Sequence, residues 1–192
     1  NLHHPLNLEV IGPEAQHDNM QSVAYRVIWG FLRKCPASKV RFCIFDPKEG
    51  GGSVRMLSNF VNKMPDSYKK AVTQMSRTEE LLSCLKELEG QTLDFIRDRP
   101  DYDDLLDYNA HNLRRTEAIT LLMLYDFPLN ADARCLELLS SVMQKGNKCG
   151  IYVVLCRNTA VEVASSYDHV DEKLAELEKN CVQIECKENG FA

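Results

Sequence analysis

Short runs rich in β-branched and aromatic residues alternate with longer runs of helical apolar spacing along the chain. Parallel strands need long crossover connections, and these are usually helices, so the alternation indicates an α/β fold. The nearly continuous apolar run at 118–126 (Ala-Ile-Thr-Leu-Leu-Met-Leu-Tyr-Asp) is typical of a strand that is buried on both faces. We therefore expect a mostly parallel central sheet flanked by helices.

The order of the expected elements follows from where each pattern starts and stops. The expected strands cover residues 8–11, 40–45, 71–73, 118–126, 151–156 and 181–185. The expected helices run from Asp18 through Leu32, from Ser76 to before Pro100, over 131–145 and over 168–179, with a short surface helix or loop at 101–109. Two pairs have the spacing of a capping box, Asp18 with Gln21 and Ser76 with Glu79. Gly146 has the position of a glycine that ends a helix.

The length of 192 residues is that of one ordinary domain, and no repeat or internal boundary divides it. With 44% hydrophobic and 27% charged residues, the composition is that of a globular chain with a buried core. No apolar run approaches the roughly 20 residues needed to cross a bilayer. We therefore expect a single domain at 1–192 that does not itself insert into a membrane.

Charge and cysteine content narrow the possible partners. The formal net charge of −5 excludes a basic field over the whole domain, so any contact with DNA would be local. The candidate residues for such a contact are the pairs Lys69–Lys70 and Arg114–Arg115. The eight cysteines lie mostly inside apolar runs and lack the C-x-x-C spacing of a zinc site, which favours a reducing compartment.

Ligands of open parallel sheets bind beyond the carboxyl ends of the strands, which points first to the turn from Gly12 to Asn19. A strand, a turn and a helix are the setting of a phosphate-binding loop, which requires a second glycine, a lysine and a hydroxyl residue. Those three positions hold His17, Asp18 and Asn19. A carboxylate at the helix start repels phosphate, so we expect Asp18 to act as an N-cap.

Asp126 closes the buried run at 118–126, the position from which P-loop enzymes hold Mg²⁺. Hydrolases of this kind usually carry a second carboxylate next to this aspartate to polarise the attacking water. Phe127 takes that place. No residue of the chain stands out as catalytic.

Several short sequence motifs, taken in their order along the chain, resemble those of the FtsK/SpoIIIE family of P-loop motor ATPases, which includes modules of type VII secretion motors. The matching motifs are Leu8–Gly12, Asp46-Pro47-Lys48, Ala71-Val72-Thr73, Asp107-Tyr108-Asn109, Leu121–Asp126 and Gly146–Leu155. Each motif by itself is unspecific, and the resemblance rests on the order and spacing of the motifs. It implies a RecA-like P-loop NTPase fold and a module excised from a larger multidomain protein.

The same resemblance implies a site, a cofactor and partners. ATP and Mg²⁺ would be the cofactors, with Asp126 as the metal residue. The implied nucleotide-binding residues are Gly12, Pro13, Glu14, Ala15, Gln16, His17, Asp18, Asn19, Asp46 and Asn158. Other modules or subunits of a ring-shaped motor would be the partners, with DNA as a further partner of the full-length protein. The expected location is cytoplasmic, in a parent protein that is membrane-associated.

Departures from the family pattern all concern the hydrolytic reaction. The loop lacks its lysine and hydroxyl residue, Phe127 replaces the catalytic glutamate, and Asn147 replaces an arginine. The sensor glutamine has become Asn158 or Arg157. We therefore expect a degenerate module with a structural or regulatory role in a DNA-translocating or secretion motor. Two alternatives stay open: an active ATPase completed by neighbouring subunits, and a nucleotide-free protein-interaction domain.

Overall fold

A computed structural model describes residues 7–47, 61–161, 170–187 and 190–191. Its sheet has the strand order β3-β2-β4-β5-β1-β6-β7, and the pairings from β1 to β6 are all parallel. The strands are β1 (Asn7–Gly12), β2 (Val40–Phe45), β3 (Val72–Met75), β4 (Ile119–Phe127), β5 (Ile151–Asn158), β6 (Cys181–Lys187) and β7 (Gly190–Phe191). Only the short β7 is antiparallel to its neighbour within the described chain. The expected α/β fold with a mostly parallel sheet is confirmed.

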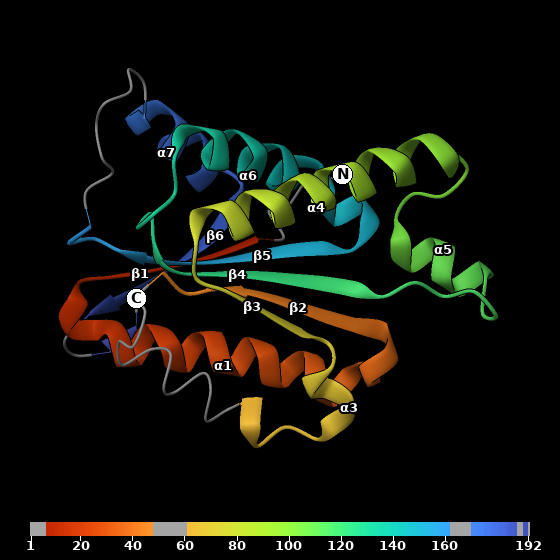
Figure 1. Ribbon diagram of the computed structural model, residues 1–192, viewed down its shortest axis with the longest axis horizontal. Coiled ribbons are helices and arrows are strands. Elements are labelled where there is room, and N and C mark those ends of the chain that lie inside the picture. The colour runs from red at the N-terminus through yellow and green to blue at the C-terminus, as the bar shows by residue number, and fades with distance from the viewer. Residues whose placement is uncertain (1–6, 48–60, 162–169, 188–189, 192) are drawn as a thin grey trace.

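Helices cover both faces of this sheet (Figure 1). One face carries α1 (His17–Lys34) and α3 (Asp66–Lys69). The other carries α4 (Thr78–Asp98), α6 (Ala133–Lys145) and α7 (Val170–Glu178). The short α5 (Leu105–His111) lies past the end of the sheet at which β4 begins. Within the described ranges, short 3₁₀ turns connect these elements: η1 (Glu14–Gln16), η2 (Ala37–Lys39) and η3 (Gly146–Cys149).

The core lies on both faces of the central strand β4. Leu122 and Leu124 point into the cluster beneath α4 and α6, while Leu121 and Met123 point into the cluster above α1. Successive side chains alternate between the faces because the strand has a period of two. The expectation that 118–126 is buried on both faces is therefore confirmed.

The expected helix start at Asp18 is wrong in detail, whereas the expected helix end at Gly146 is confirmed. Gln16 is the N-cap of α1, and Asp18 lies inside the first turn, where its carbonyl oxygen accepts from the Ser22 hydroxyl at 2.8 Å. The η1 turn moves the helix start towards the N-terminus, so the cap position falls before Asp18. Gly146 ends α6 with a right-handed φ of −64°, and the left-handed glycine is Gly150, after η3.

The long helix α4 begins with a capping box that is shifted by one residue from the expected pair. Arg77 is the N-cap, and Glu80, rather than Glu79, reaches back to the backbone N–H groups of Ser76 and Arg77 at 2.9 and 3.1 Å. These bonds, with the Arg77 guanidinium, hold the pKa of Glu80 at about 2. The carboxylate is therefore bound in its charged form.

We expect Glu80→Ala to lower the thermal midpoint more than Glu79→Ala, because Glu79 is exposed in the same turn without this role. A carboxyl with a depressed folded-state pKa stabilises above its unfolded value near 4.5, and this is lost as the pH falls through about 2. The difference between wild type and Glu80→Ala should therefore shrink over that range. Thermal unfolding followed by circular dichroism checks this, and a pH-independent difference would contradict it.

Candidate functional site

The carboxyl ends of β1 and β5 meet tightly at one edge of the sheet. The Thr159 N–H donates to the Gly12 carbonyl at 3.0 Å, which ties the end of β1 to the residue after β5. A Cβ at Gly12 would lie 3.2 Å from the Met20 sulfur and 3.3 Å from the Cys186 Cβ. A side chain at this position would therefore press against its neighbours, so the absence of a Cβ at Gly12 allows close packing.

Asp126 reaches the same edge through an irregularity at the end of β4. The register with β5 shifts between Leu124 and Phe127, and Asp126 has a left-handed φ of 47°. Aspartate tolerates this conformation better than most residues, and a bulge re-aims the side chain that it carries. The side chain of Asp126 is completely buried as a result.

Among the described residues, Asn158 and His17 face the Asp126 carboxylate, and Glu14 is linked to it through Asn158. Asn158, at the end of β5, donates its amide to Asp126 Oδ1 at 3.2 Å and also to the carboxylate of Glu14. His17 Nε2, at the start of α1, lies 3.7 Å from Asp126 Oδ2. We call Glu14, His17, Asp126 and Asn158 the carboxyl-end cluster. The polar contacts of this cluster connect η1, α1, β4 and β5.

The described residues do not fit a nucleotide phosphate. The carboxyl-end cluster holds two carboxylates, and its one group that can become cationic, His17, faces Asp126. Asp18 adds a further acid in the first turn of α1. The Gln16 N–H, which could face an anion, donates to the Pro13 carbonyl at 2.8 Å. The turn is therefore closed by its own hydrogen bonds and is negatively charged where phosphate would need positive charge.

The same residues do not fit a magnesium ion. Asn158 Nδ2 and His17 Nε2 face the two oxygens of Asp126, so nitrogen atoms stand where oxygen ligands would be needed. No group of three or more His, Cys, Asp or Glu side chains in the described part of the chain is arranged to hold a metal. None of the eight cysteines forms a disulfide.

The other predicted site residues are spread around this cluster. Pro13 and Ala15 are exposed on the turn, and Asn19 donates to the side chain of Gln16 at 2.5 Å. Asp46, at the end of β2, is buried, and its N–H donates to the Met75 carbonyl at 2.8 Å. The structure thus brings Glu14, His17, Asp126 and Asn158 into contact.

Asp46 influences two tyrosines between α1 and the sheet, the half-buried Tyr25 and the buried Tyr125. Burial, and then the charge of Asp46, raises the pKa of Tyr25 well above its usual value. Burial also raises the pKa of Tyr125, with Cys156 and then Tyr25 adding to the effect. Both hydroxyls are therefore held in their neutral form, and neither is suited to act as a base.

Sequence reasoning missed an ion-pair network beside the cluster. Glu9 is almost fully buried in β1, where it accepts from Gln183 at 2.9 Å and lies 3.5 Å from the Arg157 guanidinium. Arg157 also pairs with Glu178 of α7. A charged residue inside the apolar strand 8–11 was the available signal, because buried charges are normally paired.

Comparison with solved structures confirms the fold that the sequence resemblance implied. The cytoplasmic domain of the type VII secretion ATPase EccC from Thermomonospora curvata matches 94% of this chain, with 15% identity and a TM-score of 0.64. ATPases 2 and 3 of EssC from Geobacillus thermodenitrificans match 95%, with 13% identity and a TM-score of 0.63. The pCW3 conjugation coupling protein TcpA, solved with ATPγS, matches 95%, with 12% identity and a TM-score of 0.64.

The chain therefore shares the α/β fold of these ATPase domains. The chain spans 20% of the matched EccC chain and 32% of the matched EssC chain. No protein-family model and no curated protein sequence matches it. Among the described helices, none has both the length and the apolar character needed to span a membrane.

Proposed function

We propose that this domain is a non-hydrolysing module of a motor assembly, with a structural or regulatory role. The observation that carries the proposal is the carboxyl-end cluster, in which His17 and Asn158 face the Asp126 carboxylate and Asn158 also binds Glu14. The motor fold and the small share of each matched chain support placing the domain among further modules of a larger machine. The transported substrate would be a protein in a secretion motor or DNA in a translocase.

The cluster supports this role because side chains of the chain itself occupy the space around the Asp126 carboxylate. A ligand that needed Asp126 would first have to displace the amide of Asn158 and the ring of His17. It would also have to overcome the negative charge of Glu14 and Asp18 at the start of α1. The module would then contribute its shape and its contacts to the assembly rather than a hydrolytic cycle.

We expect Mg²⁺-ATPγS to leave the thermal midpoint of the isolated chain unchanged. A ligand at a hundred times its Kd stabilises a folded protein by about 2.7 kcal/mol. For a domain of this size that corresponds to roughly 5–10 °C. Thermal unfolding with and without the nucleotide measures this. A rise of that size that disappears in Asp126→Ala would contradict the proposal.

A second candidate is an ATPase whose missing groups come from a neighbouring subunit. The observation in its favour is that the matched TcpA structure contains ATPγS. ATP turnover by the whole assembly separates the two functions. Asp126→Asn should leave turnover unchanged for a non-hydrolysing module, and it should lower turnover by about a hundredfold or more if this site carries the reaction.

A further inference from the structure

Two neighbouring cavities open at the amino-terminal edge of the sheet, opposite the carboxyl-end cluster. The larger, about 450 Å³, lies between η2, the start of β2, the end of α3 and residues 116–118. The smaller, about 350 Å³, lies between the start of β4 and the last turns of α4. Both are lined by Arg41, Glu117 and Ala118, so they form one hollow, which we call the amino-edge groove.

Two cationic side chains, Arg41 and Lys70, line the larger cavity of this groove. Arg41 extends from β2 and Lys70 follows α3, and both side chains are exposed. In the described part of the chain, neither has an ion pair or a side-chain hydrogen bond, whereas the adjacent Lys69 pairs with Asp66 at 3.0 Å. The hydroxyl residues Ser38, Ser67 and Thr116 line the same cavity. The cavity therefore offers several hydrogen-bond donors at one place.

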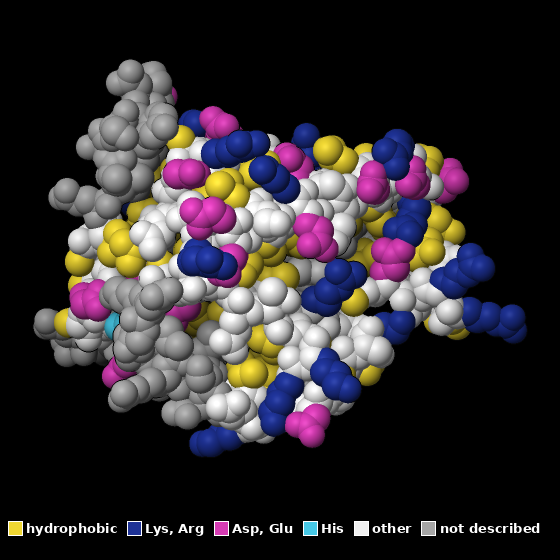
Figure 2. Space-filling model, viewed as in Figure 1, with side chains coloured by type: hydrophobic (Ala, Val, Ile, Leu, Met, Phe, Trp, Pro, Cys, Tyr) yellow, Lys and Arg dark blue, Asp and Glu magenta, His cyan; other side chains and the backbone are white. Residues whose placement is uncertain are grey.

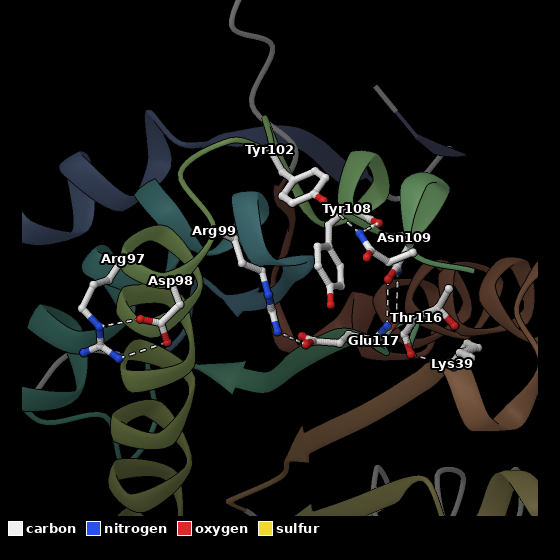
Figure 3. A network of polar contacts seen from close by, with 10 residues as sticks. Lys39, Arg97, Asp98, Arg99, Tyr102, Tyr108, Asn109, Thr116 and Glu117 are labelled. Atoms are coloured by element: carbon white, nitrogen blue, oxygen red, sulfur yellow. Dashed lines mark hydrogen bonds and ion pairs between the residues drawn. The ribbon is translucent and has the colours of Figure 1, made fainter. Parts of the chain in front are cut away.

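The wall shared by the two cavities is held in position by a polar network (Figure 3). Lys39 donates to the Thr116 carbonyl at 2.7 Å, which connects η2 to the segment before β4. Asn109 of α5 exchanges two hydrogen bonds with the backbone of Glu117, at 3.0 and 2.7 Å. A wall fixed in this way reduces the ordering cost that a ligand would otherwise meet.

The acidic residue of this wall is neutralised on its other side. Glu117 forms an ion pair with Arg99, whose guanidinium lies 4.3 Å from the ring centroid of Tyr108. The stacking holds Arg99 in place, and Arg99 in turn engages the Glu117 carboxylate. Arg41 and Lys70 therefore leave the larger cavity with net positive charge, although the chain as a whole carries −5.

We propose that the larger cavity of the amino-edge groove binds a small phosphorylated compound, with Arg41 and Lys70 holding its phosphate. An arginine fork can bind two phosphate oxygens at once, and a lysine supplies a mobile point charge for a third. Hydroxyl groups complete the donor set for a tetrahedral oxyanion, which has more oxygens to satisfy than a carboxylate. A volume near 450 Å³ lies in the usual range for a site that takes one small molecule.

The arrangement favours a compact ligand over a nucleic-acid strand. Lys and Arg side chains also occur around this end of the molecule, as Figure 2 shows at its lower right. The two free cations nevertheless converge on one cavity, and Glu117 borders it on the side of β4. A nucleic-acid backbone would need a continuous row of cations without such an acidic border.

Isothermal titration of the 192-residue chain with sodium pyrophosphate tests the proposal. We expect binding that weakens about tenfold or more in Arg41→Gln and in Lys70→Gln, because each removes a charge-assisted hydrogen bond. Lys86→Gln is the matched control, since Lys86 is an exposed cation on α4 away from the groove. Unchanged thermal midpoints of all three variants verify that the fold is intact.

A parallel titration with a short DNA duplex separates the two sources of phosphate. Pyrophosphate binding that depends on Arg41 and Lys70, with no duplex binding that depends on them, supports the proposal. No pyrophosphate binding up to about 10 mM would overturn it, as would equal affinity in wild type and both variants. Duplex binding through Arg41 and Lys70 without pyrophosphate binding would also overturn it and would indicate a nucleic-acid surface.

Discussion

Leu122→Ala is expected to lower the free energy of unfolding by about 2–5 kcal/mol, because removing buried methyl groups leaves a cavity. Leu122 lies at the centre of β4 and has no exposed surface. Its neighbours on paired strands are Cys43 of β2 and Val153 of β5, so two sheet neighbours and the helices above limit collapse around the hole.

Urea unfolding measures this effect, and Leu113→Ala is the matched control. Leu113 is 81% exposed, so its truncation should change the unfolding free energy by less than about 0.5 kcal/mol. Equal losses in the two variants would mean that β4 is not the buried centre of the sheet. A loss below about 1 kcal/mol for Leu122→Ala would mean the same.

Gly150→Ala is expected to be the second strongly destabilising change. Gly150 has a φ of 74°, and a left-handed conformation costs an L-residue about 1–2 kcal/mol. A Cβ at this position would also lie 2.3 Å from Leu105 Cδ2, and Leu105 is itself buried. The added methyl group must therefore displace the first residue of α5. The thermal midpoint should fall by roughly 2–4 °C for each kcal/mol lost.

The clash and the backbone strain can be separated with a second substitution. In the background of Leu105→Ala, Gly150→Ala should cost less than in wild type, because the clash is gone and only the backbone conformation remains unfavourable. Gly90→Ala is the control, since nothing lies within 4 Å of a Cβ there and alanine favours the interior of α4. It should raise the midpoint. Equal costs of Gly150→Ala in both backgrounds would exclude the Leu105 contact.

The sequence could predict which residues lie at the strand ends of the candidate site, because the location of these ends follows from the topology of a parallel sheet. Strands that are all parallel place their carboxyl ends at one edge, so Gly12, Asp126 and Asn158 had to lie near one another. Their mutual contacts could not be predicted in the same way. The approach of His17 to Asp126 depends on the η1 turn and on the left-handed φ of Asp126, and neither has a local sequence signal.

The helix starts show why local patterns fail at element ends. Asp18 with Gln21 has the spacing of a capping box, but the turn before α1 moves the cap to Gln16. Ser76 with Glu79 has it as well, but Glu80 forms the bonds. A capping motif can be placed at several adjacent starting residues in such a segment, and packing of the helix against the sheet selects one of these positions.

The sequence by itself determined the α/β class and the order of the strands along the chain, because apolar periodicity reports which residues must leave water. It also determined that His17, Asp18 and Asn19 follow the first strand at the positions where a phosphate-binding loop would need a glycine, a lysine and a hydroxyl residue. Only the tertiary structure decided that the Asp126 carboxylate is engaged by His17 and Asn158. It alone brought Arg41 and Lys70 to one cavity. Contacts between residues far apart in sequence depend on how the helices pack across the sheet, and no local pattern records that packing.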